Sequence, residues 1–95
     1  MKEKDVEKAL VRAVEKAGGL CWKFTSPGTD GVPDRLVLLP GGRMSFAEVK
    51  APGKEPRALQ KIRHEELKKL GFRVYVIDDP LQIQKILTET NGGAV

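Results

Sequence analysis

Near the middle of the chain lies the stretch GVPDRLVLLPGGRMSFAEVK, residues 31–50, which predicts two paired β-strands. Residues 35–39 (RLVLL) are almost uniformly apolar, as is typical of a strand that is covered on both faces. Pro40, Gly41 and Gly42 turn the chain, and residues 43–50 (RMSFAEVK) return along it. Because the connecting loop is so short, we expect the two strands to form an antiparallel hairpin.

The returning strand carries charges on a face that otherwise looks like core. Alternate side chains of a strand share a face, and on one face of this strand they are Met44, Phe46, Glu48 and Lys50. A buried charge needs a partner or a use, and antiparallel pairing brings Asp34 back toward Glu48 and Lys50. Two such close carboxylates repel each other unless a cation lies between them, and Mg²⁺ binds oxygen ligands of this kind. The hairpin therefore predicts a divalent-metal site, at which Lys50 orients a water molecule or stabilises charge on a phosphate group.

Hydrophobic periodicity, glycines and prolines predict the elements around the hairpin. In chain order we expect a helix, a strand, the hairpin, a second helix, a strand and a short helix, over residues 5–17, 20–25, 35–39 with 43–50, 56–70, 72–77 and 80–87. The buried stripe of the second helix is expected at Leu59, Ile62, Leu67 and Leu70. The fold class is therefore α/β, a small mixed sheet flanked by helices in the order α-β-β-β-α-β-α, with the last strand parallel to an earlier one.

Length and composition indicate one small domain. The chain has 95 residues, of which 40% are hydrophobic and 32% charged, as in a soluble globular protein. We expect a single domain over residues 1–95, with a frayed tail at about residues 88–95. The sequence has neither a run of about 18 apolar residues nor a signal peptide, and its lone Cys21 suits a reducing compartment, so a cytoplasmic protein is predicted. Because so short a chain buries little surface alone, a homodimer is expected.

Basic charge is concentrated in one segment. The net charge of the chain is +4, whereas residues 50–73 hold eight lysine and arginine residues against three glutamates, a local excess of five. Such a concentration suits a phosphate-binding face. The candidate nucleic-acid contacts are Ser26, Arg35, Lys54, Arg57 and Lys61. The outer face of the second helix is expected to hold Arg57, Lys61, His64 and Lys68. As a whole, this face is interpreted as a solvated surface, with phosphate contacts as the alternative.

Two motifs give the chain a resemblance to a known family. A proline and an aspartate at residues 33–34 are followed by EVK at residues 48–50, on a strand, after a helix that carries an acid. This pattern resembles the PD-(D/E)XK nuclease superfamily, whose core is restriction-endonuclease-like. The wider run KFTSPGTDGVPDRLVLLPGGRMSFAEVKAPGKEPRALQKIRHEELKKLGFRVYVID, residues 23–78, resembles the VRR-NUC (virus-type replication-repair nuclease) branch. The resemblance extends over nearly the whole chain, from about residue 3 to residue 78.

The resemblance implies a role for each residue of the hairpin site. Asp34 and Glu48 would be metal ligands, and the backbone carbonyl of Val49 would supply a further oxygen. Lys50 would be the catalytic lysine. The cofactor would be Mg²⁺ or Mn²⁺, and the reaction would be the hydrolysis of phosphodiester bonds in DNA.

The resemblance also implies two site residues outside the hairpin. The acid of the first helix corresponds to Glu7, a further metal ligand at the edge of that helix's apolar stripe, with Glu3 one turn earlier as the competing choice. The glutamine of the second helix corresponds to Gln60, which would face the same site. For both residues, a solvated helix surface is the alternative.

The expected function is that of a metal-dependent, structure-selective DNA endonuclease. Stand-alone family members of viral or prophage type resemble homodimeric resolvases of branched DNA such as Holliday junctions, and a two-fold dimer would allow paired nicks. One alternative is a nuclease of flaps or single strands without junction preference. A second is a non-catalytic nucleic-acid-binding module, against which the joint presence of Asp34, Glu48 and Lys50 argues. Trp22 is expected in the core or in a dimer interface, with base stacking as the alternative.

Overall fold

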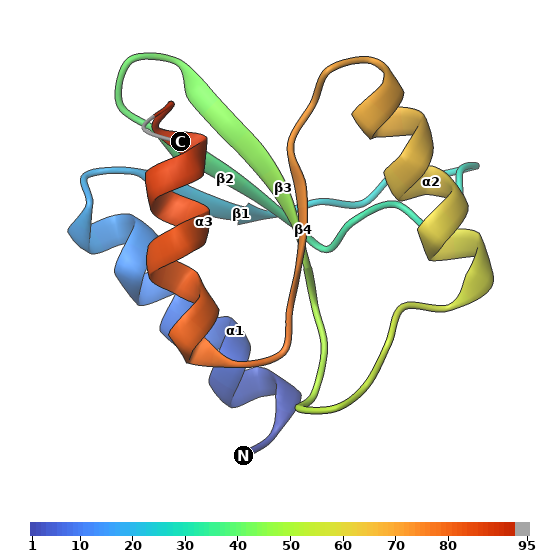
Figure 1. Ribbon diagram of the computed structural model, residues 1–95, viewed down its shortest axis with the longest axis horizontal. Coiled ribbons are helices and arrows are strands. Elements are labelled where there is room, and N and C mark those ends of the chain that lie inside the picture. Colours follow the sequence, from blue (N-terminus) through green and yellow to red (C-terminus); the bar gives the residue numbers. More distant parts are fainter. Residues whose placement is uncertain (93–95) are drawn as a thin grey trace.

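The computed structural model describes residues 1–92 and confirms the predicted order of elements. The elements are α1 (Glu3–Lys16), β1 (Leu20–Lys23), β2 (Arg35–Leu39), β3 (Arg43–Val49), α2 (Ala58–Lys69), β4 (Val74–Ile77), the 3₁₀ turn η1 (Pro80–Gln82) and α3 (Ile83–Thr90). The fold is therefore the predicted small mixed sheet flanked by helices (Figure 1).

The sheet has the order β1-β2-β3-β4. Its first three strands pair antiparallel, and β4 joins β3 in parallel, which confirms both the predicted hairpin and the predicted parallel strand. Within the hairpin, Arg35 lies opposite Ala47. Gly41 and Gly42 have φ angles of +87° and +75°, a conformation that glycine adopts readily and that so tight a turn requires.

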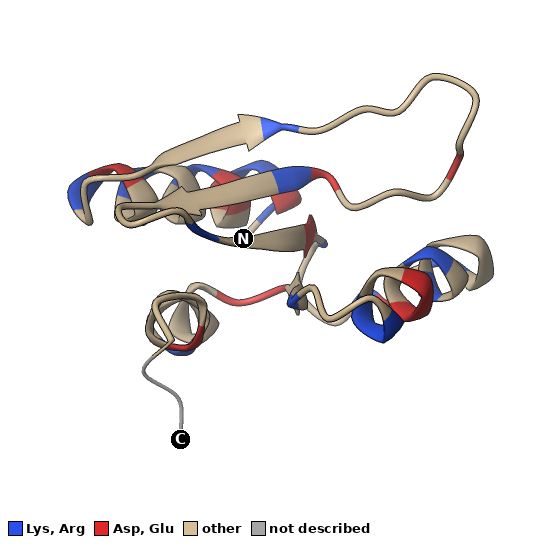
Figure 2. Ribbon diagram, turned by 90° about the horizontal axis from the view of Figure 1, so that it is seen from above, with Lys and Arg blue, Asp and Glu red and all other residues tan. Residues whose placement is uncertain are grey.

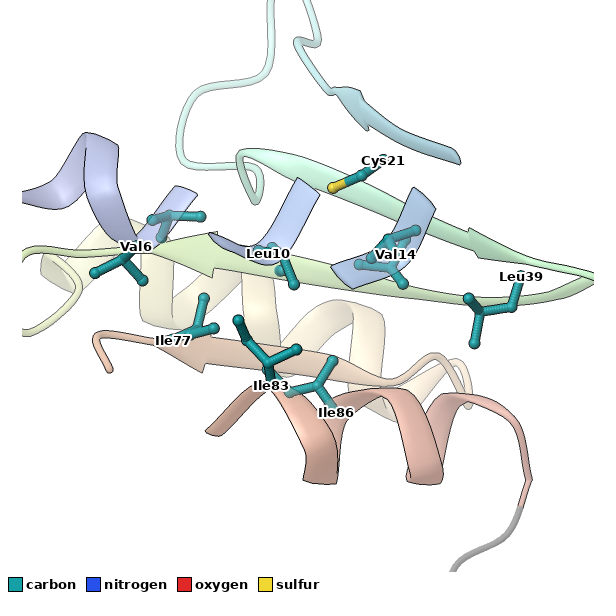
Figure 3. Close-up of a cluster of buried hydrophobic side chains, with 11 residues drawn as sticks. Val6, Leu10, Val14, Cys21, Leu39, Ile77, Ile83 and Ile86 are labelled. Atoms are coloured by element: carbon teal, nitrogen blue, oxygen red, sulfur yellow. The ribbon is translucent and has the colours of Figure 1, made fainter. Parts of the chain in front are cut away.

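The helices cover the two faces of the sheet unequally. α1 and α3 contact each other and lie over the same side of the sheet, whereas α2 lies on the other side of β4 (Figure 1). Side chains of α1 and α3 form the hydrophobic core together with those of the strands (Figure 3). The members of this core include Val6, Leu10, Val14, Val37, Ala47, Val49, Ile77, Ile83 and Ile86. Since this core uses one side of β3, the alternate side chains of that strand face α2.

The buried side of α2 differs from the sequence prediction. Three of the residues expected inside, Leu59, Ile62 and Leu70, are exposed. The buried residues of this helix are instead Gln60 and His64. The predicted apolar stripe is therefore wrong. The reason is that β3 directs the carboxylate of Glu48 toward α2, and the polar side chains of Gln60 and His64 contact it.

The end of α3 also differs from the prediction. Residues 88–90, which were predicted to fray, form the last turn of the helix. Thr90 is buried, and its hydroxyl lies 2.8 Å from the hydroxyl of Ser45 in β3. The prediction of a frayed tail is thus wrong for residues 88–90, and its last part, residues 93–95, lies outside the described residues. Within residues 1–92, no helix has the length and apolar character that crossing a lipid bilayer requires.

Candidate active site

The hairpin brings two carboxylates to the same end of the sheet. Asp34 immediately precedes β2, and Glu48 lies near the end of β3. Figure 2 shows the acidic and basic positions along the ribbon. Because Arg35 lies opposite Ala47, the register continued by one residue places Asp34 opposite Glu48. The Oδ2 atom of Asp34 accepts a hydrogen bond of 2.9 Å from the backbone N–H of Val49. This bond fixes the aspartate against β3, so the predicted proximity of the two acids is confirmed.

Glu48 is a buried carboxylate surrounded by polar groups. Its side chain is 1% exposed. Its Oε2 atom accepts a hydrogen bond of 2.9 Å from Gln60 Nε2 and lies 3.4 Å from Lys50 Nζ. Its Oε1 atom lies 3.5 Å from Nε2 of His64. Two of the residues predicted for the site, Lys50 and Gln60, therefore lie around this carboxylate together with Asp34.

The electrostatics of this cluster favour a bound cation. The pKa of Glu48 is raised from 4.5 to about 7, chiefly by burial and next by the nearby charge of Asp34, while Lys50 acts in the opposite direction. One lysine therefore does not offset the cost of placing two acids together in a buried site. The Oε1 atom of Glu48 is buried and has no hydrogen-bond partner within residues 1–92. A divalent cation held by carboxylate oxygens fits this donor set, since hard cations bind such oxygens.

His64 contributes a neutral imidazole to the cluster. Burial lowers the pKa of His64, and the positive charge of Lys68 lowers it further. The residue was predicted on the outer face of α2, and that prediction is wrong because the side chain is 6% exposed and faces Glu48. The signal that would have located it is its spacing, since a residue four positions after Gln60 lies on the same side of a helix.

A cavity of about 340 Å³ adjoins Asp34. It is bordered by the loop between β1 and β2, and also by Asp34, Arg57 and Gln60. Ser26 lies in the same lining. Two of the side chains predicted to contact nucleic acid, those of Ser26 and Arg57, therefore border the space next to Asp34.

Two further predicted contacts lie away from this cavity. Lys54 is exposed in the loop that leads into α2, and this loop is tied to the end of β4 by a hydrogen bond of 3.1 Å from the Gly53 N–H to Asp78. Lys61 is exposed on α2, and its Nζ atom lies 3.8 Å from Glu55. Both side chains are accessible, and neither is among the residues that border the cavity.

Glu7 and Arg35 are placed differently from the prediction. The Nε atom of Arg35 lies 2.8 Å from Glu7 Oε2, and another guanidinium nitrogen donates to the carbonyl oxygen of Cys21. Arg35 is paired with Ala47, whose side chain belongs to the core on the α1 side, whereas the next residue of β3, Glu48, faces the other side. The structure thus places Glu7 in an ion pair across the sheet from the carboxylate site. The structure therefore does not bring Glu7 into the cluster around Glu48, and its role as a metal ligand stays a prediction. The ion pair leaves Arg35 engaged with Glu7.

Comparison with known proteins identifies the relatives of this chain. No protein-family model matches the chain. A protein of Acyrthosiphon pisum secondary endosymbiont phage 1, named "Putative nuclease p44", is 46% identical over 91 residues, which are 96% of this chain and 97% of the relative. A solved structure described as a VRR_NUC domain superposes with a TM-score of 0.84 at 32% identity and covers 92% of this chain and 96% of its own. This chain belongs to the VRR-NUC family. The resemblance predicted from the two motifs is thereby confirmed, and the cluster around Glu48 is the candidate active site of a VRR-NUC nuclease domain.

Proposed function

We propose that this VRR-NUC domain is a metal-dependent DNA endonuclease that hydrolyses phosphodiester bonds. The observation that carries the proposal is the buried Glu48 carboxylate, with Asp34 held opposite it and Lys50 Nζ at 3.4 Å. Acids placed beside a phosphate would weaken its binding unless a cation lies between them. A domain that only bound nucleic acid would gain nothing from this arrangement, so catalysis is favoured over the alternative of a binding module.

Asp34 and Glu48, with the backbone carbonyl of Val49, would hold Mg²⁺ or Mn²⁺. When bound, such an ion supplies Lewis-acid activation of a water molecule and neutralises phosphate charge. Both acids are held in place before a cation binds, since the Val49 N–H donates a hydrogen bond to Asp34 and the Gln60 amide donates one to Glu48. Ligands that are fixed in advance require less reorganisation when the cation binds.

The basic side chains would act on the substrate. Lys50 lies beside the acids, where its ammonium group would orient the attacking water or stabilise the negative charge that develops on the phosphate. Arg57 and Ser26 border the adjoining cavity and would contact neighbouring phosphates of the same strand. Lys54 and Lys61 are exposed nearby along the chain and would extend this contact.

The preferred substrate is proposed to be branched DNA bound by a homodimer. The support for a dimer is an apolar surface, since Leu20 and Trp22 on the edge strand β1 are 49% and 56% exposed. They share a face of the sheet, and the phage origin of the p44 relative fits the expected viral or prophage type. A two-fold dimer would present two active sites to a symmetric four-way junction.

One variant tests the chemistry. Lys50→Ala should fold and bind DNA but cleave about 10²–10³-fold more slowly, the usual loss when one group that stabilises transition-state charge is removed. Lys85→Ala, which removes an equal charge from an exposed position of α3, is the matched control and should cleave like the wild type. Wild-type cleavage by Lys50→Ala would overturn the proposed mechanism.

A substrate panel tests the choice of DNA. Labelled four-way junction, flap, linear duplex and single strand would each be incubated with the protein and Mg²⁺, Mn²⁺ or EDTA. Metal-dependent cleavage of the junction in preference to the others is the expected result. Cleavage of flaps or single strands alone would contradict the proposed preference for junctions and would still support the proposal that the protein is a nuclease. A folded protein that binds these DNAs but cleaves none of them would favour the alternative of a non-catalytic nucleic-acid-binding module.

A further inference from the structure

The buried side of α2 is polar, and both of its residues reach the same carboxylate. Gln60 and His64 lie four positions apart, so they project from one side of the helix. Gln60 Nε2 donates to Glu48 Oε2 at 2.9 Å, and His64 Nε2 lies 3.5 Å from Glu48 Oε1. Each oxygen of the carboxylate is therefore next to a different side chain of α2.

The contact between His64 and Glu48 is not explained by packing. Both side chains are almost fully buried, and both His64 Nε2 and Glu48 Oε1 lack a hydrogen-bond partner among the described residues. Buried polar atoms without partners destabilise a fold. An apolar side chain at position 64 would avoid that cost on the helix side. We therefore look for the role of the His64 imidazole in its effect on the Glu48 carboxylate.

We propose that His64 is a positioning residue that donates its Nε2–H to Glu48 Oε1 and, with Gln60, sets the orientation in which Glu48 binds a divalent cation. The inference rests on the proposed function, because it concerns the metal-ligand role of Glu48. The separation of 3.5 Å is longer than a usual hydrogen bond, and such bonds at active sites are commonly long until the ligand is in place. Gln60 donates only to Oε2, so the carboxylate group can still rotate and move Oε1. A donor at Oε1 would remove this freedom.

The first test measures cation affinity directly, without DNA. Mn²⁺ binding to the full chain would be measured by calorimetry and by the electron paramagnetic resonance signal of free Mn²⁺, for the wild type, His64→Leu and His64→Gln. Removal of a group that orients a metal ligand commonly lowers affinity about 10–100-fold, and we expect this loss for His64→Leu. Glutamine carries an amide N–H near the position of Nε2, so His64→Gln should bind within a few-fold of the wild type.

Controls separate a positioning role from a structural one. Gln84→Leu exchanges an exposed neutral side chain of α3 and should leave Mn²⁺ affinity unchanged. Unfolding temperatures recorded with EDTA identify any variant whose fold is damaged. Equal Mn²⁺ affinity of His64→Leu and wild type would overturn the inference, as would a loss for His64→Gln equal to that of His64→Leu.

The second test needs no variant, because His64 is the single histidine of the chain. Its ring nitrogens therefore give one set of signals in a ¹⁵N NMR spectrum. We expect Nε2 to carry the proton both before and after Mg²⁺ is added, with slower exchange of that proton in the presence of the ion. A deprotonated Nε2 in the Mg²⁺ form would indicate direct coordination and would overturn the positioning role, even if His64→Leu did not fold.

These outcomes differ from a failure of the proposed function. A wild-type protein that binds Mn²⁺ but cleaves no DNA would contradict the nuclease proposal, while the His64 inference would still be decided by the affinities. A wild-type protein that binds no Mn²⁺ would contradict both. A cleaving wild type whose His64→Leu variant keeps full Mn²⁺ affinity would contradict the inference alone.

Discussion

At the scale of single residues, the cluster around Glu48 carries an electrostatic cost to the stability of the fold. A carboxylate with 1% exposure and a second acid opposite it destabilises the metal-free fold whenever both are ionised. The elevated pKa of Glu48, about 7, expresses this cost. A bound cation would reverse it, because the ion needs the ionised carboxylate.

This conflict predicts how stability depends on pH. Because the pKa of Glu48 is raised in the fold from 4.5 to about 7, the folded state holds this proton more tightly than the unfolded chain between those values. The stabilisation from this group is therefore complete below about pH 4.5 and is lost as the pH rises to about 7. Urea unfolding in EDTA would measure the free energy of unfolding at pH 5 and at pH 8. It should be higher at pH 5, by at most roughly 3 kcal/mol from this one group.

The variant Glu48→Gln isolates that contribution from all other titrating groups. It keeps the shape of the side chain and removes the charge, so the metal-free variant should be more stable than wild type at pH 8 and close to it at pH 5. The same variant should lose Mn²⁺ binding. A stability difference between variant and wild type that does not change from pH 5 to pH 8 would contradict the assigned pKa shift.

At the scale of elements, the three helices differ in how they contribute. α1 buries Val6, Leu10 and Val14 in the core, whereas α2 buries only polar side chains and leaves Ile62 exposed. The first helix therefore stabilises the fold through apolar burial, and the buried side chains of the second contact Glu48 in the candidate active site. α2 is accordingly expected to tolerate exchange of its apolar residues.

A pair of substitutions tests this division. Leu10→Ala removes methyl groups from a fully buried position and should lower the free energy of unfolding by about 2–5 kcal/mol. Ile62→Gln changes a side chain that is 53% exposed and should change it by no more than about 0.5 kcal/mol. Chemical denaturation of both variants gives the comparison, and equal losses would show that the Ile62 surface is covered in solution.

The elements also divide into those that the sequence predicts and those that it does not. The hairpin of β2 and β3 follows from local signals, namely two apolar runs joined by a glycine turn, and alternation along β3 then places Glu48 and Lys50 correctly. The buried side of α2 does not follow, because apolar residues predict burial only where the surface beneath is apolar. The position of Glu7 does not follow either, since periodicity locates it at the edge of α1 without specifying that Arg35 lies within reach.

At the scale of the whole molecule, the uneven cover of the sheet is the feature that bears on assembly. α1 and α3 shield one side, whereas α2 has its main strand contacts with β4 alone, at the far edge from β1. Trp22 lies opposite Leu36, and neither faces the side of Cys21, which belongs to the core. The β1 half of the α2 side therefore presents apolar side chains that no helix covers among the described residues, and an exposed apolar surface of this kind commonly marks an interface.

The variant Trp22→Glu tests whether that surface joins two copies of the chain. A charge at the centre of an apolar interface is strongly unfavourable, so light scattering after size exclusion should report a dimer for the wild type and a monomer for the variant. Leu81→Glu, at an exposed apolar position of η1, is the control and should remain dimeric.

Because Asp34, Glu48 and Lys50 all come from one chain, the monomer should keep Mn²⁺ binding and single-strand nicking. Paired cleavage of a four-way junction should be lost, because it needs two active sites held together. A wild-type monomer, or a Trp22→Glu dimer, would place any interface elsewhere.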